Sequence, residues 1–105
     1  MCGIVGYLEL DEHSLAGIDL QKMAKTLHHR GPDAAGYFEE ERIGLAHKRL
    51  SIIDLSDAAN QPMQSHDGRY VIVFNGEIYN YVELRSELMA QGYQFRSKGD
   101  TEVLL

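Results

Sequence analysis

Cys2 is the only cysteine in the chain, and Gly3 follows it directly. If Met1 is removed, Cys2 carries a thiol and a free α-amine on one residue. A thiol is a weak nucleophile until a base takes its proton, and a neutral α-amine can accept that proton directly or through a water. The alternative is that Met1 is retained and Cys2 is a small buried hydrophobic residue. Position alone leaves both interpretations open.

Other residues could supply a substrate site for such a nucleophile. Attack of a thiolate on a carboxamide creates an oxyanion, and the Asn75 amide with the Gly76 N–H is a suitable pair of donors for it. The guanidinium of Arg49 can bind an α-carboxylate bidentately, and the carboxylate of Asp100 can bind an α-ammonium group. Glutamine offers all three groups, so the combination predicts a glutamine-directed site.

Each of these residues also has an ordinary structural interpretation. Asn75-Gly76 is the commonest pair in hairpin turns. Arg49 could be a surface partner of a carboxylate, and Asp100 could be only a helix N-cap. Residues 30–33 (RGPD) could serve only to end a helix, because the residue before proline disfavours the helical conformation. The combination, and no single motif, favours catalysis.

The expected strands lie between these motifs. Apolar content predicts a strand at residues 3–10, and two further strands are expected at 35–40 and 43–50 around the charged turn 40–42. A short strand is expected at 93–96, and the run YVIVF predicts a strand over 70–74 that is covered on both faces. The segment from Asp54 to Met63 is polar and contains Pro62, so we expect a loop there.

Two helices are expected, with the start of a third. One runs from Ser14 to about His29 and buries the face formed by Leu20, Met23, Ala24 and Leu27. The second follows Asn80, which forms an Asn-x-x-Glu variant of the capping box with Glu83. It buries Tyr81, Leu84 and Leu88 and ends before Gly92 as its C′ residue. A third would begin at Asp100 or Thr101, but the sequence stops one turn later, which predicts a fragment cut inside a domain.

Composition narrows the classes of protein further. A length of 105 residues suits at most one domain. Ten Lys and Arg against sixteen Asp and Glu give a formal charge of -6, which argues against nucleic acid as a partner. A single cysteine fits a reducing cytoplasm. We expect no membrane span, because no apolar run is long enough, and no metal site, because the five histidines show no ligand pattern.

Six segments together are typical of one family and occur in that family's order: MCGIVG at 1–6, HRGPD at 29–33, LAHKRLSI at 45–52, QPM at 61–63, NGEIYN at 75–80 and DTEV at 100–103. In these segments the chain resembles the N-terminal part of the glutaminase domain of class II amidotransferases, which are N-terminal-nucleophile hydrolases. Among these it most closely resembles the asparagine synthetase branch, because the sister branches carry other residues at RGPD and NGEIYN. Ala34 departs from the glycine that many members carry at this position.

This resemblance implies a fold and a set of roles. The fold is α+β, an αββα four-layer sandwich, of which residues 1–105 would be a partial glutaminase domain truncated at its C-terminal end. Cys2 would be the nucleophile, and Asn75 with Gly76 would form the oxyanion hole. Glutamine would also contact the remaining members of the implied set, which are Arg49, Leu50, Ile52, Ile53, Glu77 and Asp100.

The resemblance also implies partners. Ammonia from glutamine would pass to a downstream synthetase domain in the same chain, which is absent here and would use ATP and Mg to amidate aspartate. No cofactor is expected within residues 1–105, and the protein could be a homodimer. Two alternatives stay open: an amidotransferase of the same type that aminates another acceptor, such as a sugar, and a non-catalytic segment with a structural or interaction role.

Overall fold

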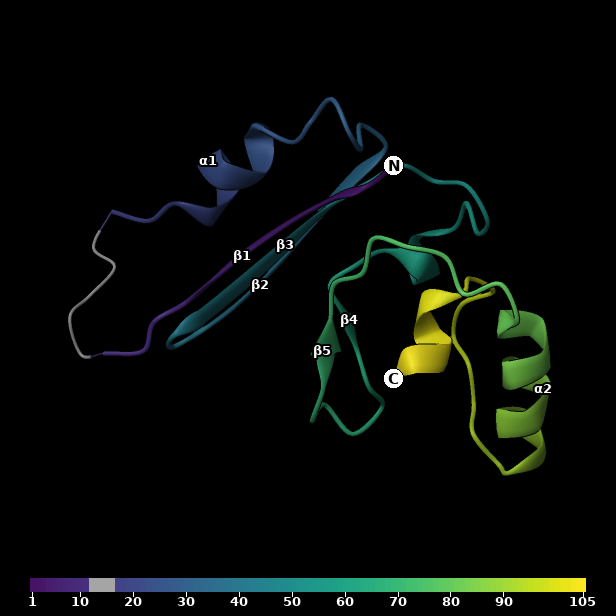
Figure 1. Cartoon of the computed structure of the whole chain (residues 1–105). Helices are drawn as coiled ribbons and strands as arrows, with labels where there is room; N and C mark the ends of the chain where they lie inside the picture. Colours follow the sequence, from purple (N-terminus) through teal and green to yellow (C-terminus); the bar gives the residue numbers. More distant parts are fainter. Residues whose placement is uncertain (12–16) are drawn as a thin grey trace.

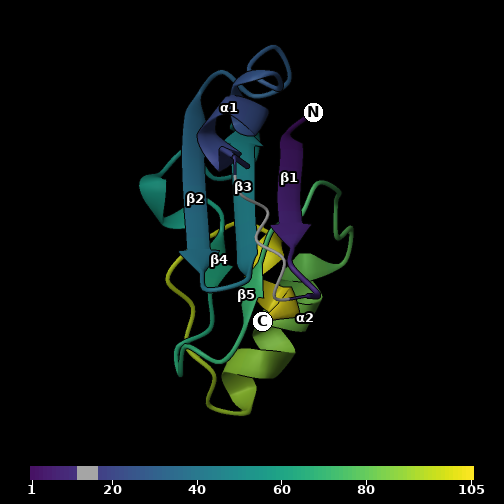
Figure 2. The ribbon, with the colours of Figure 1, turned by 90° about the vertical axis from the view of Figure 1, so that its left-hand side faces the viewer.

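The computed structural model describes residues 1–11 and 17–105. A three-stranded antiparallel sheet carries the helix α1 on one face, and a second layer made of a short hairpin, a second α-helix and two 3-10 turns lies on the opposite face (Figures 1 and 2). This is an α+β arrangement, and the expectation of that class is confirmed.

The sheet consists of β1 (Gly3–Leu8), β3 (Ile43–Arg49) and β2 (Ala34–Glu40), in that spatial order. β3 is central, and both of its neighbours run antiparallel to it, with Gly3 opposite Lys48 and Ala34 opposite Arg49. The three predicted strands are therefore confirmed, although β1 ends at Leu8. This register brings the N-terminus beside the residues that follow β3.

The helix α1 (Leu20–Lys25) packs on this sheet. Leu20 and Ala24 form the core with Ala46 of β3, so the predicted apolar face is confirmed at these two residues. Met23 is only half-buried, and Leu27 lies beyond the end of the helix and is half-buried. The helix is shorter than the predicted span of 14–29. It begins after Asp19, whose carboxylate accepts the Lys22 N–H at 3.1 Å, because Gly17 has a φ of 97° that a helix cannot continue through. The expected start at Ser14 lies outside the described residues.

The second layer contains β4 (Met63–Gln64) paired antiparallel with β5 (Val71–Ile72) and two 3-10 turns, η1 (Asp57–Ala59) and η2 (Thr101–Leu104). The predicted strand over 70–74 is thus reduced to two residues that are half-buried, and its expected burial on both faces is wrong. The physical reason is that its only partner among the described residues, β4, is itself two residues long.

The predicted strand over 93–96 is also wrong. Its backbone groups bond to side chains instead of a ladder: the Gln94 carbonyl lies 3.0 Å from His66 Nε2, and the Arg96 N–H donates to the Glu102 carboxylate at 2.9 Å. Alternation of residue types cannot reveal such side-chain partners, because they come from distant segments or from the following turn.

The helix α2 (Tyr81–Ala90) follows Asn80, and Gly92 lies just beyond its end with a φ of 97°, as expected. The predicted capping box is wrong, because the Asn80 side chain makes no capping hydrogen bond and its backbone is not extended (φ -99°, ψ 27°). The stripe of Tyr81, Leu84 and Leu88 is half-buried. No helix in the described part of the chain is long and apolar enough to cross a membrane.

Candidate active site

A cavity of about 420 Å³ opens where the N-terminus and the end of β3 meet the second layer. Its walls come from four separate segments, 1–2, 47–54, 74–79 and 97–101, together with residues 59–63. All nine residues chosen from the sequence line this one cavity: Cys2, Arg49, Leu50, Ile52, Ile53, Asn75, Gly76, Glu77 and Asp100. Their placement agrees with a common site, while their individual roles stay predictions.

Cys2 is half-buried at the start of β1 and is held from two sides. The Leu50 N–H donates to Cys2 Sγ at 3.3 Å, and the same sulfur lies 3.6 Å from the Leu50 carbonyl oxygen. On the backbone, Arg30 Nε–H donates to the Cys2 carbonyl at 3.2 Å. The thiol is therefore fixed against the residue that follows β3.

The loop at residues 30–33 organises this corner. The Asp33 N–H donates to the Arg49 carbonyl at 3.0 Å, and Asp33 Oδ2 accepts the Ser51 N–H at 2.8 Å. Gly31 lies directly against the Lys48 carbonyl, and a Cβ at that position would overlap it. The RGPD loop thus holds the segment that contacts the Cys2 thiol.

Arg49 is buried at the end of β3, and residues of the following loop accept three hydrogen bonds from its guanidinium. Nη1 donates to the Ser56 carbonyl and to Asn60 Oδ1, each at 2.7 Å, and Nη2 donates to the Asp54 carbonyl. A guanidinium has five N–H donors, so Nε–H and one N–H of Nη2 remain. Two donors are the number that a bidentate carboxylate takes.

Asn75 and Gly76 are exposed at the cavity wall and directly follow Phe74, whose backbone N–H is hydrogen bonded to a side chain. The Phe74 N–H donates to Gln61 Oε1 at 2.5 Å, and Gln61 Nε2 donates to Thr101 Oγ1 at 3.2 Å. A Cβ at Gly76 would lie 2.6 Å from Cζ of the Phe74 ring. The segment that carries the proposed oxyanion donors is therefore anchored just before them.

Asp100 is buried and uses one carboxylate oxygen within the protein. Its Oδ2 accepts the Ile78 N–H at 2.9 Å, which joins the 96–101 segment to the 74–80 segment. Oδ1 has no hydrogen-bond partner among the described residues, and Asp100 is one of the residues that line the cavity. The expected capping role is wrong, because Asp100 precedes η2 without a side-chain capping bond.

Three titratable residues on the cavity wall, Asp54, His47 and Tyr79, are missing from the sequence-based set. The Ser56 side chain, together with the N–H groups of Lys98 and Ser56, lowers the pKa of Asp54 to about 2, so this carboxylate is ionised at neutral pH. Burial lowers the pKa of His47, which keeps the imidazole neutral, and neither ring nitrogen has a hydrogen-bond partner in the part described. Alternation along β3, which places His47 on the face of Arg49, was the signal available in the sequence.

Residues 1–11 and 17–105 contain no group of three or more His, Cys, Asp or Glu side chains arranged to hold a metal ion. The cavity is lined by a thiol, a guanidinium with two N–H donors that have no partner among the described residues, an amide, and a carboxylate with one oxygen that has none there either. That set can bind a small amino acid by its charged ends and present its side chain to sulfur.

Comparison with known proteins gives an independent result. Residues 1–105 match a family model described as a glutamine amidotransferase domain. The chain is 49% identical to glutamine-hydrolyzing asparagine synthetase 1 of Bacillus subtilis, over all of this chain and 17% of that protein. It is 38% identical to glutamine-hydrolyzing asparagine synthetase B of Escherichia coli and 34% identical to amidase chry2 of Gibberella zeae, again over all of this chain but 19% and 17% of those proteins. The chain thus spans less than a fifth of the length of these relatives.

Proposed function

The chain belongs to the glutamine amidotransferase domain family, and from that premise we propose that it forms the N-terminal portion of the glutaminase of an asparagine synthetase-type enzyme. The reaction is hydrolysis of glutamine to glutamate and ammonia. The observation that carries this proposal is that the Cys2 thiol, Arg49, Asn75 and Asp100 line one cavity although they lie far apart in the sequence.

The chemistry starts at the Cys2 sulfur. After removal of Met1, the α-amine of Cys2 takes the thiol proton, and the thiolate attacks the side-chain carboxamide carbon of glutamine. The resulting oxyanion is stabilised by the Asn75 amide and the Gly76 N–H. The C–N bond then breaks, and the leaving nitrogen takes the proton held by the α-amine and departs as ammonia. Water hydrolyses the thioester to glutamate and restores the thiol.

The remaining groups bind the substrate. The Nε–H and the remaining Nη2–H of Arg49 bind the α-carboxylate, aided by backbone groups of residues 50–53, and the free Oδ1 of Asp100 binds the α-ammonium group. Glu77 lines the same cavity and contributes to the pocket around the substrate. Because these groups contact both charged ends of an amino acid, they place the carboxamide at one position relative to sulfur.

Met1 is part of the precursor state. Its side chain lines the cavity and is 73% exposed, and its peptide bond makes the Cys2 nitrogen an amide that cannot act as a base. Removal of Met1 both frees the α-amine and clears that side chain from the cavity. We propose that this processing step precedes activity.

The wider enzyme is proposed from the relatives. Two of them are named as glutamine-hydrolyzing asparagine synthetases, which supports a synthetase domain in the same protein. We propose that this domain uses ATP and Mg to amidate aspartate. We also propose the complete αββα sandwich for the whole domain, a cytoplasmic location and a homodimer. The sheet between α1 and the second layer is compatible with that sandwich.

A second candidate function differs only in what receives the ammonia. One relative that matches this whole chain is named as an amidase, and none of the cavity residues contacts an acceptor in the chemistry above. An amidotransferase with another acceptor, such as a sugar, would therefore use the same glutaminase residues. A purely structural role has weaker support, because it leaves the convergence of thiol, guanidinium, amide and carboxylate unexplained.

The decisive assay is ammonia release from glutamine by the full-length protein that carries this sequence. The Cys2→Ala variant should lose this activity entirely, and Cys2→Ser, which retains a weaker nucleophile, should lose most of it. Asp67→Ala serves as the control, because Asp67 lies in an exposed turn outside the cavity. Ammonia release that persists in Cys2→Ala would contradict the proposal. Addition of aspartate and ATP, compared with sugar acceptors, separates the two candidate functions.

A further inference from the structure

The binding of glutamine proposed above needs two charged groups at a fixed separation. An α-carboxylate and an α-ammonium group share one carbon atom, so Arg49 and Asp100 must be held at matching positions. They lie on different segments, at the end of β3 and at the start of η2. A contact between these two segments is therefore needed to fix the distance between Arg49 and Asp100.

The Arg49 side of the site is built by one loop. Its guanidinium donates to the carbonyls of Asp54 and Ser56 and to the side chain of Asn60. Among these three partners, only Asp54 also hydrogen bonds to the segment that leads to Asp100. Asp54 therefore contacts Arg49 through its backbone and is free to act elsewhere through its carboxylate.

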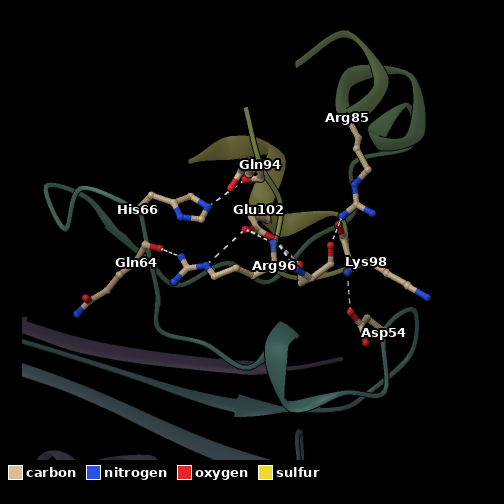
Figure 3. A network of polar contacts seen from close by, with 10 residues as sticks. Asp54, Gln64, His66, Arg85, Gln94, Arg96, Lys98 and Glu102 are labelled. Atoms are coloured by element: carbon tan, nitrogen blue, oxygen red, sulfur yellow. Dashed lines mark hydrogen bonds and ion pairs between the residues drawn. The ribbon is translucent and has the colours of Figure 1, made fainter. Parts of the chain in front are cut away.

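The carboxylate of Asp54 completes the connection. Its Oδ2 accepts the Lys98 N–H at 2.7 Å, two residues before Asp100, while Oδ1 accepts the Ser56 N–H at 2.8 Å. Figure 3 shows the Lys98 backbone directly facing the Asp54 side chain. Packing agrees with this contact, since a Cβ built on Gly99 would lie 3.8 Å from the Asp54 Cβ, which is ordinary contact distance.

The other contacts of the 96–100 segment keep its shape but do not reach Arg49. The buried Glu102 carboxylate accepts the N–H groups of Arg96 and Ser97, at 2.9 and 2.8 Å (Figure 3). Arg85 of α2 donates through Nη2 to the carbonyls of Ser97 and Gly99. These bonds fix the shape of the segment, which is also anchored by the Ile78 N–H on Asp100 and by the Gln61 side chain on Thr101. The Lys98 contact is the one that connects it to a residue whose backbone carbonyl accepts from Arg49.

We propose that Asp54 is a positioning residue that sets the separation between Arg49 and Asp100 and thereby makes the site selective for substrates with both an α-carboxylate and an α-ammonium group. This inference rests on the proposed glutaminase function. Asp54 does not touch the substrate in this account. It acts by hydrogen bonds that reach both ends of the binding site at once.

The test compares glutamine with glutaramate, which is glutamine without its α-amine, as substrates of the full-length protein. The wild-type ratio of kcat/KM for the two amides measures how well the site uses the α-ammonium group. In Asp54→Ala, the KM for glutamine should rise about tenfold to a hundredfold with a smaller change in kcat, because a charged hydrogen bond is lost and Asp100 is displaced. The glutamine-to-glutaramate ratio should fall about tenfold, because glutaramate does not use Asp100.

Two further variants sharpen the result. Asp54→Asn should lie between wild type and Asp54→Ala, because an amide oxygen can accept only one of the two N–H groups well, and it carries the test if Asp54→Ala does not fold. Asp67→Ala is the matched control, since Asp67 accepts the Ser65 hydroxyl at 2.7 Å and the Arg69 N–H at 3.1 Å in a similar local turn outside the cavity.

A general loss of folded protein lowers turnover of both amides by the same factor and leaves their ratio unchanged. An unchanged ratio in both Asp54 variants, or an equal fall in Asp67→Ala, would overturn the inference. Failure of the proposed function has a different signature, which is wild-type protein that releases no ammonia from glutamine or releases it without Cys2.

Discussion

Replacing Gln61 by Met should loosen the backbone just before the proposed oxyanion donors. Gln61 is buried, and its side chain accepts the Phe74 N–H at 2.5 Å and donates to the Thr101 hydroxyl at 3.2 Å. Methionine has nearly the same length and can do neither. The Phe74 N–H then loses its partner in a half-buried position.

The expected size follows from that unpaired donor. A donor left without a partner costs about 1–3 kcal/mol, which corresponds to roughly 5- to 150-fold in a local opening equilibrium. Hydrogen exchange at the Phe74 amide should therefore accelerate by a factor in that range. Because Asn75 and Gly76 follow directly, kcat for ammonia release should also fall, up to about 100-fold if one oxyanion donor is lost completely.

Two comparisons isolate the cause. Gln61→Glu keeps an oxygen for the Phe74 N–H and can accept from the Thr101 hydroxyl, so it should retain most of the exchange protection. Gln91→Met makes the same chemical change at an exposed position after α2 and should alter neither measurement. Unchanged exchange at Phe74 in Gln61→Met would refute the reasoning, since the hydrogen bond would then not hold this backbone.

Three further outcomes are expected. Asp100→Asn should raise the KM for glutamine about tenfold or more with a smaller effect on kcat, because the amide still accepts the Ile78 N–H but lacks the charge for an ammonium group; an unchanged KM would contradict this role. Gly31→Ala should lower both the thermal stability and the glutaminase activity, because its Cβ has no space beside the Lys48 carbonyl, and a wild-type melting curve would argue against that close approach. The folded-state pKa of Asp54 is about 2, below its ordinary value, so the stability that its carboxylate contributes is complete above about pH 4 and is lost as the pH falls through about 2. The melting temperature should therefore decrease less steeply between about pH 4 and about pH 2 for Asp54→Asn than for wild type.

The sheet could be predicted from sequence because its signals are local. The charged turn after residue 40 separates β2 from β3, and the apolar residues Leu20 and Ala24 of α1 are buried against Ala46. The strand expected over 93–96 could not be corrected from sequence. Its backbone partners are the side chains of His66 and Glu102, which the fold alone brings there.

Some residues of the candidate site could likewise be predicted from sequence, and others could not. The combination of chemical types led to Cys2, Arg49 and Asp100 as candidates, because a thiol, a guanidinium and a carboxylate suit the three groups of glutamine; their roles stay predictions. Asp54 escaped notice because a carboxylate in a polar loop looks like any solvated residue until Lys98 is seen to donate to it. His47 lies two residues before Arg49 in a strand and within the segment LAHKRLSI, but neither observation pointed to a role of its own.

The central claim is that Cys2 is an N-terminal nucleophile directed at glutamine. Its most direct test is the intact mass of the full-length protein purified from cells, before and after treatment with a glutamine analogue that carries an electrophilic side-chain ketone. We predict that Met1 is absent, that one equivalent of analogue is added at Cys2, and that excess glutamine prevents the addition. Retention of Met1, or labelling that glutamine does not compete with, would contradict the account.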